Sequence, residues 1–267
     1  MHSKCQKFFA SFFQKRCFFP SLHLLPVDVV SGTHLVLIPS YNTGVRLAHT
    51  AAQALRHWQP VWIVIDGSTD GSGVELPLGA GMRVIRRAHN GGKGAAVLDG
   101  LRAAGARGFT HVLVMDADGQ HPAEEIGNFM EISRQNPAAM ILGQPVFDAS
   151  APRIRIFGRR ISNVLARLET GQNIGDALFG FRIYPVAELL AIMEANRDMR
   201  GYDFDTEAVV RLCWRGVKAI KRPAPVRYIS KGLGGVSHFR YGRDNLRLAA
   251  MHLRLINEAF FRVRRDR

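Results

Sequence analysis

The sequence predicts an α/β fold: a single domain with a mostly parallel sheet and helices on both of its faces. Two observations lead to this class. From residue 34 onward, short apolar runs alternate with segments whose apolar residues recur every three or four positions, as in amphipathic helices. The apolar runs are nearly continuous, which is typical of parallel strands that are covered on both faces. With 267 residues, 47% of them hydrophobic, the chain can form one large core.

The expected elements of the first half follow one another in a regular order. Five apolar runs predict strands at residues 34–39, 61–65, 82–87, 111–115 and 138–143. Three segments between them predict helices at residues 45–58, 92–106 and 122–135. The last of these helices opens with a proline and two acidic residues, as helix starts prefer.

The second half is less regular. It predicts helices at residues 160–169 and 206–216, and strands at residues 179–185, 217–223 and 225–230. The last segment, residues 244–267, predicts a basic amphipathic helix. One face of that helix carries Leu246, Ala249, Leu253, Ile256 and Phe260, and arginines lie towards another face. We expect the apolar face to pack against the domain; the alternative is that the arginines hold the helix on an anionic membrane surface.

The charge of the chain predicts an anionic partner. The formal net charge is +14, which suits nucleic acid, nucleotide phosphates or an acidic membrane surface. The chain has neither zinc-finger spacing nor the aromatic-basic strand pattern of an RNA-binding sheet, so we expect no nucleic-acid partner. The three cysteines show no metal-ligand spacing and give no disulfide framework, which fits a cytoplasmic setting.

Residues 1–33 form an N-terminal extension of unusual composition. Six phenylalanines alternate with lysine and arginine in its first twenty positions, and a polar stretch at residues 14–16 interrupts any signal-peptide core. The extension is either disordered or a short segment that contacts a membrane surface.

Polar clusters follow three of the predicted strands. They are PSYN after the first strand, DGSTD after the second and DADGQ after the fourth. Ligands of parallel α/β sheets bind at the carboxyl ends of the strands, so these clusters predict one shared binding site.

The DADGQ cluster predicts a metal site. Asp116 and Asp118 lie on the same side of an extended segment and repel each other unless a cation lies between them. Hard divalent cations prefer carboxylate oxygens, so Mg²⁺ or Mn²⁺ fits the pair. The alternative is a turn in which Asp118 caps the next helix.

The series IPSYN, VIDGSTDGS, HNGGKGAAVLDGL, MDADGQHP and GFRIYP, in this order, resembles the family 2 glycosyltransferases. The most similar branch contains the dolichyl-phosphate mannose synthases and the bacterial polyprenyl-phosphate glycosyltransferases. The resemblance covers residues 34–237. It implies a GT-A fold, a UDP- or GDP-linked sugar donor, and Mg²⁺ or Mn²⁺ held by Asp116, Asp118 and Gln120.

The resemblance also implies a donor-binding set. Its members are Pro39, Tyr41, Asn42, Asp66, Ser68, Lys93 and Asp116. Relatives usually carry two consecutive acids where this chain has Ile65 and Asp66, which weakens a choice between uridine and guanosine. The alternative for Lys93 is a solvated lysine at a helix start.

Further residues are assigned to catalysis and to the acceptor by the same resemblance. Asp205 is the expected base, Glu207 is its rival, and Arg182 is expected near the phosphates; the alternative for both acids is a helix start that favours negative charge. The acceptor or phosphate contacts are Arg153, Arg155, Ser237 and Arg240. The sequence GQP replaces the Gly-Ser-Arg that dolichyl-phosphate relatives often carry, so the acceptor is less well defined than the donor.

The expected function is therefore metal-dependent, inverting sugar transfer from a nucleotide-diphosphate sugar to a lipid-type acceptor, with polyprenyl phosphate as the first candidate. The domain at residues 34–237 and the helix at residues 238–267 would lie peripherally on the cytoplasmic face of a membrane. Two alternatives remain: a hydroxyl acceptor on a cell-envelope glycan or glycolipid, and a non-catalytic, basic relative that binds nucleotide or membrane.

Overall fold

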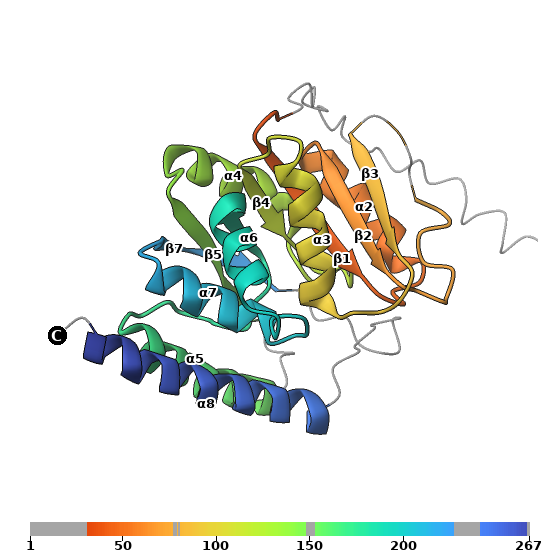
Figure 1. Cartoon of the computed structure of the whole chain (residues 1–267). Coiled ribbons are helices and arrows are strands. Elements are labelled where there is room, and N and C mark those ends of the chain that lie inside the picture. The colour runs from red at the N-terminus through yellow and green to blue at the C-terminus, as the bar shows by residue number, and fades with distance from the viewer. Residues whose placement is uncertain (1–30, 77–78, 80, 148–152, 227–240, 266–267) are drawn as a thin grey trace, which may run out of the picture.

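The computed structural model describes residues 31–76, 79, 81–147, 153–226 and 241–265 (Figure 1). Seven strands form one open sheet in the order β3-β2-β1-β4-β6-β5-β7. The strands are β1 (His34–Ser40), β2 (Val61–Asp66), β3 (Met82–Arg87), β4 (His111–Val114), β5 (Ala139–Val146), β6 (Arg182–Pro185) and β7 (Lys218–Pro225). Strand β6 runs antiparallel to both of its neighbours, and all other pairs are parallel. The expected mostly parallel sheet is confirmed.

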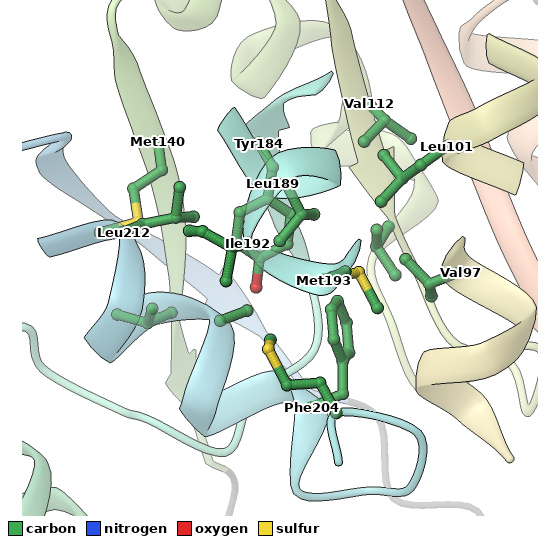
Figure 2. Packing of buried hydrophobic residues seen from close by; sticks show 14 of the residues in the cluster. Val97, Leu101, Val112, Met140, Tyr184, Leu189, Ile192, Met193, Phe204 and Leu212 are labelled. Carbon is green, nitrogen blue, oxygen red and sulfur yellow. The ribbon is translucent and has the colours of Figure 1, made fainter. Parts of the chain in front are cut away.

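Helices cover both faces of this sheet. They are α2 (Arg46–His57), α3 (Lys93–Gly105), the 3-10 turn η1 (Ala123–Glu125), α4 (Ile126–Gln135), α5 (Arg153–Thr170), α6 (Val186–Ala195), α7 (Phe204–Trp214) and α8 (Tyr241–Arg265). Helices α2 and α4 pack on one face, and α3, α6 and α7 pack on the other. Figure 2 shows side chains of α3, α6 and α7 that share one core cluster with Val112, Met140 and Tyr184 of the sheet.

The second half differs from the expectation at two elements. Helix α6 was not predicted. It follows β6 directly, so no loop residues mark the end of the strand. The strand expected at residues 225–230 has no separate counterpart among the described residues: Pro225 ends β7, and residues 227–230 lie outside the described part of the chain, as does most of the N-terminal extension.

The orientation predicted for the C-terminal helix is wrong. Helix α8 packs on the domain through Leu248, Met251 and Leu255, whereas Leu246 and Leu253 of the predicted packing face are 72% and 70% exposed. Both sets of leucines recur at helical spacing, so either stripe could have covered the core. Within the described residues, no helix is both long and apolar enough to cross a bilayer.

A pair of stacked histidines lies at the amino ends of β1 and β4. The rings of His34 and His111 are 4.4 Å apart, and His34 Nε2 lies 3.0 Å from Ser133 Oγ. Burial, followed by the nearby His111 and Arg134, lowers the pKa of His34 to about 4. The neutral ring is therefore part of the folded state at pH 7.

This pair predicts a loss of stability in mild acid. The unfolded chain binds the proton near pH 6.5 and the folded chain only near pH 4, so stability is complete above pH 6.5 and falls as the pH drops towards 4. The cost of protonating His34 is on the order of 3 kcal/mol, because one pKa unit is worth about 1.4 kcal/mol. Urea unfolding from pH 7 to pH 4.5 should show a shallower fall for His34→Asn than for the wild type. The exposed His57→Asn is the control, and an equal fall in all three proteins would contradict the prediction.

Candidate active site

Three charged side chains from distant parts of the sequence meet at the carboxyl edge of the sheet. Lys93 begins α3, Asp116 follows β4, and Asp205 lies in the first turn of α7. Lys93 Nζ is 2.6 Å from Asp116 Oδ1 and 2.6 Å from Asp205 Oδ2. The Lys93 side chain is only 8% exposed, so the alternative of a solvated lysine is wrong. We call these three residues the lysine–carboxylate cluster.

The charges of this cluster stabilise one another. Burial alone would lower the pKa of Lys93, but the two carboxylates outweigh it and raise that pKa. Burial alone would raise the pKa of Asp116, but Lys93 and His121 hold it at about 2. Burial raises the pKa of Asp205 although Lys93 opposes it. The Asp116 side chain keeps 35% of its surface exposed, whereas that of Asp205 keeps 7%. Asp116 is therefore the member of the cluster that a ligand can reach.

Asp118 lies beside Asp116, and among the described residues no cationic side chain lies within ion-pair distance of it. Burial, and then the charge of Asp116, raise the pKa of Asp118 to about 6. Its Oδ1 accepts a hydrogen bond from the backbone N–H of Gln120 at 3.0 Å. No side chain caps the turn η1, so the capping alternative for Asp118 gains no support.

The residues present fit a divalent cation. Two carboxylates that repel each other offer the hard oxygen ligands that Mg²⁺ and Mn²⁺ prefer, and a cation between them would relieve the repulsion that raises the pKa of Asp118. Within the described part of the chain, no three histidine, cysteine or acidic side chains gather into a closed metal site. Water, the diphosphate of the expected donor, or Gln120, which is partly exposed, would fit as further ligands.

His121 supports Asp116 and was not predicted as a site residue. Its Nδ1 accepts the backbone N–H of Asp116 at 2.9 Å, and its Nε2 lies 3.5 Å from Asp116 Oδ2. The rings of Phe179 and Phe181 pack edge-on against it. Burial lowers the pKa of His121 to about 4, so the ring is neutral at pH 7. The sequence signal was present, because His121 directly follows DADGQ.

Two further residues line the cluster without a signal in the sequence. Burial, with the charge of Asp116, raises the pKa of Tyr202 to about 12, and this residue is partly exposed. Gly180 lies against the cluster so closely that a Cβ there would be 2.6 Å from Lys93 Nζ. Position 180 therefore has no room for a side chain while Lys93 holds its two carboxylates.

Arg182 lies beneath the cluster. Its side chain has no exposed surface, and its guanidinium donates hydrogen bonds to the Asp176 carbonyl at 3.0 Å, to the Tyr184 hydroxyl at 3.3 Å and to the Asp205 carbonyl. In this conformation Arg182 fixes the start of α7, and its side chain has no surface that a ligand could contact. Its expected contact with the donor stays a prediction.

Glu207 differs from Asp205 in its partners. Its carboxylate has no exposed surface and lies between two arginines, with Oε1 2.7 Å from Arg211 Nε and Oε2 2.6 Å from Arg254 Nη2. Arg254 belongs to α8, so this network ties α7 to α8. Of the two candidate bases, Asp205 is the one that lies in the lysine–carboxylate cluster.

Replacing Glu207 by glutamine should therefore cost stability and spare the chemistry. We expect the free energy of unfolding to fall by about 3 kcal/mol, because two arginines lose a buried counter-charge. Urea unfolding measures the loss, and Glu258→Gln, at the exposed end of the same network, should cost less than about 1 kcal/mol. A Glu207→Gln enzyme that is stable but inactive would make Glu207 the base instead.

The loops expected to hold the donor nucleotide are tied to each other. The backbone N–H of Asn42 donates to Ser68 Oγ at 3.0 Å, and the N–H of Thr69 donates to Asn42 Oδ1 at 2.8 Å. Tyr41 is partly exposed beside them, whereas Pro39 is buried in β1. These hydrogen bonds bring the PSYN and DGSTD clusters together, as the sequence predicted.

The Asp66 carboxylate makes hydrogen bonds that hold the fold together. It is 2% exposed, and its oxygens accept hydrogen bonds from Arg87 Nη1 at 2.9 Å and from the backbone N–H groups of Gly91 and Gly92 at 3.0 and 2.8 Å. The carboxylate thereby fixes the loop that leads to Lys93. If Asp66 also contacts the nucleotide, as predicted, its carboxylate oxygens would have to accept a further hydrogen bond beside these three.

The predicted acceptor residues lie largely outside the described residues. Arg153 and Arg155 belong to the beginning of α5, and Ser237 and Arg240 fall in residues 227–240, which the structure does not describe. Their roles stay predictions.

The mostly parallel sheet, whose central strand β4 leads into two neighbouring aspartates, has the GT-A fold known from glycosyltransferases. The family model "Glycosyl transferase family 2" matches residues 35–189, and the chain belongs to this family.

Curated relatives and solved structures agree with this membership. The chain is 29% identical over 211 residues to polyprenol monophosphomannose synthase of Mycolicibacterium smegmatis, covering 75% of this chain and 78% of that protein. It is 28% identical to undecaprenyl-phosphate mannosyltransferase of Micrococcus luteus, covering 75% and 85%. Glucosyl-3-phosphoglycerate synthase of Mycobacterium tuberculosis, solved with Mn²⁺, UDP-glucose and phosphoglyceric acid, shares the fold with a TM-score of 0.59 and 16% identity, over 84% of this chain and 80% of that one.

Proposed function

We propose that this chain is a metal-dependent, inverting glycosyltransferase that moves a mannosyl group from a nucleotide-diphosphate donor to polyprenyl phosphate. The observation that carries the proposal is the pair Asp116 and Asp118 at the end of β4, beside the buried Lys93. The names of the two curated relatives supply the sugar and the acceptor.

Asp116 and Asp118 would hold the cation. When bound there, Mg²⁺ or Mn²⁺ would offset the negative charge that the diphosphate leaving group gains. The residues of this chain do the positioning. His121 orients Asp116, and the hydrogen bonds between the Asn42 and Ser68 loops hold the donor pocket together.

The state of the candidate bases supports a phosphate acceptor. A hydroxyl acceptor needs a carboxylate that removes its proton, but Lys93 occupies Asp205 Oδ2 and two arginines occupy Glu207. A phosphate monoester is already anionic near pH 7, with a second pKa of about 6. Its oxygen can attack the anomeric carbon from the face opposite the diphosphate without any base, which inverts the configuration.

One observation favours the second candidate, a hydroxyl acceptor. Asp205 Oδ1 is buried without a hydrogen-bond partner among the described residues, so this oxygen would accept a proton if the acceptor approached it. The raised pKa of Asp205 agrees with such a role.

The test is transfer of radiolabel by the full chain with Mn²⁺. Labelled GDP-mannose and UDP-glucose are each offered with undecaprenyl phosphate in detergent, and separately with 3-phosphoglycerate. We expect one donor, GDP-mannose, to move label into the organic phase, and EDTA to stop it. Label in a water-soluble product would favour the hydroxyl acceptor, and no transfer in any combination would reject the proposal. The same proposal places the protein at the cytoplasmic face of a membrane.

A further inference from the structure

Exposed apolar side chains are concentrated on two helices. Within the described residues, twelve large apolar side chains are exposed, and eight of them lie on α5 and α8. They are Ile161, Val164, Leu168, Leu246, Leu253, Ile256, Phe260 and Phe261. In α5 they recur at spacings of three and four; in α8, Leu246 and Leu253 are seven residues apart, and Ile256 and Phe260 follow at spacings of three and four. We call these eight residues the apolar platform.

The two rows of the apolar platform lie on the outer side of the domain. Helices α5 and α8 lie side by side along one edge of the molecule (Figure 1). Their inward residues, Ala166 of α5 with Leu248 and Leu255 of α8, belong to a single core cluster. The rows on the opposite sides of both helices therefore face away from that core.

The charge around the apolar platform is positive. Arg160 and Arg167 of α5 and Arg243 and Arg247 of α8 are exposed. The acidic residues of the two helices are buried or ion-paired: Glu169 and Asp244 are 4% and 2% exposed, and Glu258 pairs with Arg211. An apolar surface flanked by arginine, whose carboxylates are buried or ion-paired, complements a lipid layer that carries anionic headgroups.

We propose that the apolar platform docks flat on an anionic membrane, with the leucine and phenylalanine side chains below the headgroups and the arginines among the lipid phosphates. A second copy of this chain fits less well, because two such faces would bring their arginines together. Nucleic acid would satisfy the arginines and leave the apolar rows in water.

The docked orientation places the candidate active site close to the lipid. The Arg247 guanidinium lies beside Gly201, where a Cβ would be 3.5 Å from its Nη1, and Tyr202 of the site is the next residue. The first turns of α8 thus connect the apolar platform to the lysine–carboxylate cluster. The role of docking rests on the proposed function, because a polyprenyl phosphate has to be drawn from the bilayer. Membrane binding itself does not depend on sugar transfer.

The test is sedimentation of the full chain with vesicles of phosphatidylcholine, alone or mixed with phosphatidylglycerol. We expect binding to the mixed vesicles that weakens as salt rises. Leu246→Gln/Leu253→Gln should lower the partition coefficient about tenfold or more, because two apolar side chains lose their burial. Val74→Gln/Val146→Gln, which changes two exposed valines away from α5 and α8, is the matched control and should bind as the wild type does.

Substituting the arginines tests the electrostatic part of membrane binding independently of the leucines. Arg160→Gln/Arg167→Gln should lower binding to the anionic vesicles about tenfold and leave binding to pure phosphatidylcholine unchanged. Equal vesicle binding by the wild type and the leucine variant would overturn the proposal. So would a leucine variant that changes from dimer to monomer in light scattering, because the face would then join two copies.

An activity measurement separates this proposal from the proposed function. With a short-chain, water-soluble polyprenyl phosphate, the leucine variant should transfer sugar as fast as the wild type, whereas with long-chain acceptor in vesicles it should be slower. Vesicle binding without transfer to either acceptor would reject the proposed function and keep the docking surface. Equal rates on both acceptors would reject the docking surface.

Discussion

Asp118→Ala is expected to lower sugar transfer at least about a thousandfold, which corresponds to about 4 kcal/mol of transition-state stabilisation. The variant should stay folded. Asp118 is partly exposed, and burial together with the charge of Asp116 raises its pKa to about 6, so its removal relieves a repulsion. The loss would therefore arise in the cation site and not in the fold.

Three measurements check this prediction. Transfer assays give the rate, urea unfolding gives the stability, and melting with GDP or UDP in the presence and absence of Mn²⁺ reports the donor site. A nucleotide at 100 times its dissociation constant should add about 2.7 kcal/mol to the wild type with Mn²⁺, and much less to the variant. The exposed Glu131→Ala is the control. A nearly normal rate in Asp118→Ala would refute the metal assignment.

Lys93→Met is expected to remove both stability and activity. Its ammonium is the counter-charge of Asp116 and of the buried Asp205, at 2.6 Å from each. Breaking a buried ion pair on one side costs about 3–5 kcal/mol, because the remaining charge keeps its desolvation penalty. We expect a loss of about 3 kcal/mol, since Asp116 stays partly solvated.

A double variant separates the two effects of this change. Lys93→Met/Asp205→Asn removes the stranded charge and should regain part of the stability without regaining transfer. Lys218→Met, on exposed β7, should change neither quantity by more than about 0.5 kcal/mol or twofold. If Lys93→Met unfolds at the same urea concentration as the wild type, the cluster does not stabilise the fold.

The sequence predicted the first half of the fold well because β1, β2 and β4 are buried throughout and α2 and α4 each carry one apolar stripe. The second half has weaker signals. Helix α6 contains Val186, Leu189 and Ile192 at helical spacing, but it begins directly at the proline that ends β6, so no loop marks the boundary. In α8 two apolar stripes compete, and only the packed structure shows which one α5 and α7 leave exposed.

The part of the candidate site that lies on a single loop could be predicted from the sequence. Asp116 and Asp118 are neighbours in the sequence, and their position after a strand is enough to assign them to the carboxyl edge. The contact of Lys93 with Asp205 joins residues more than a hundred positions apart, and no local pattern shows it. Glu207 and Arg182 illustrate the same limit, because their burial depends on α8 and on the backbone of α7.

The hydrogen bond from Arg182 to the Asp205 carbonyl has a consequence for protein engineering. It anchors position 205 through its main chain, so the side chain there can be exchanged without displacing the backbone that presents it. Any replacement there keeps its backbone position but has to satisfy the Lys93 ammonium, which Asp205 pairs with at 2.6 Å. Redesign at position 205 therefore has to change Lys93 in the same step, whereas the backbone of α7 and the donor loops can stay as they are.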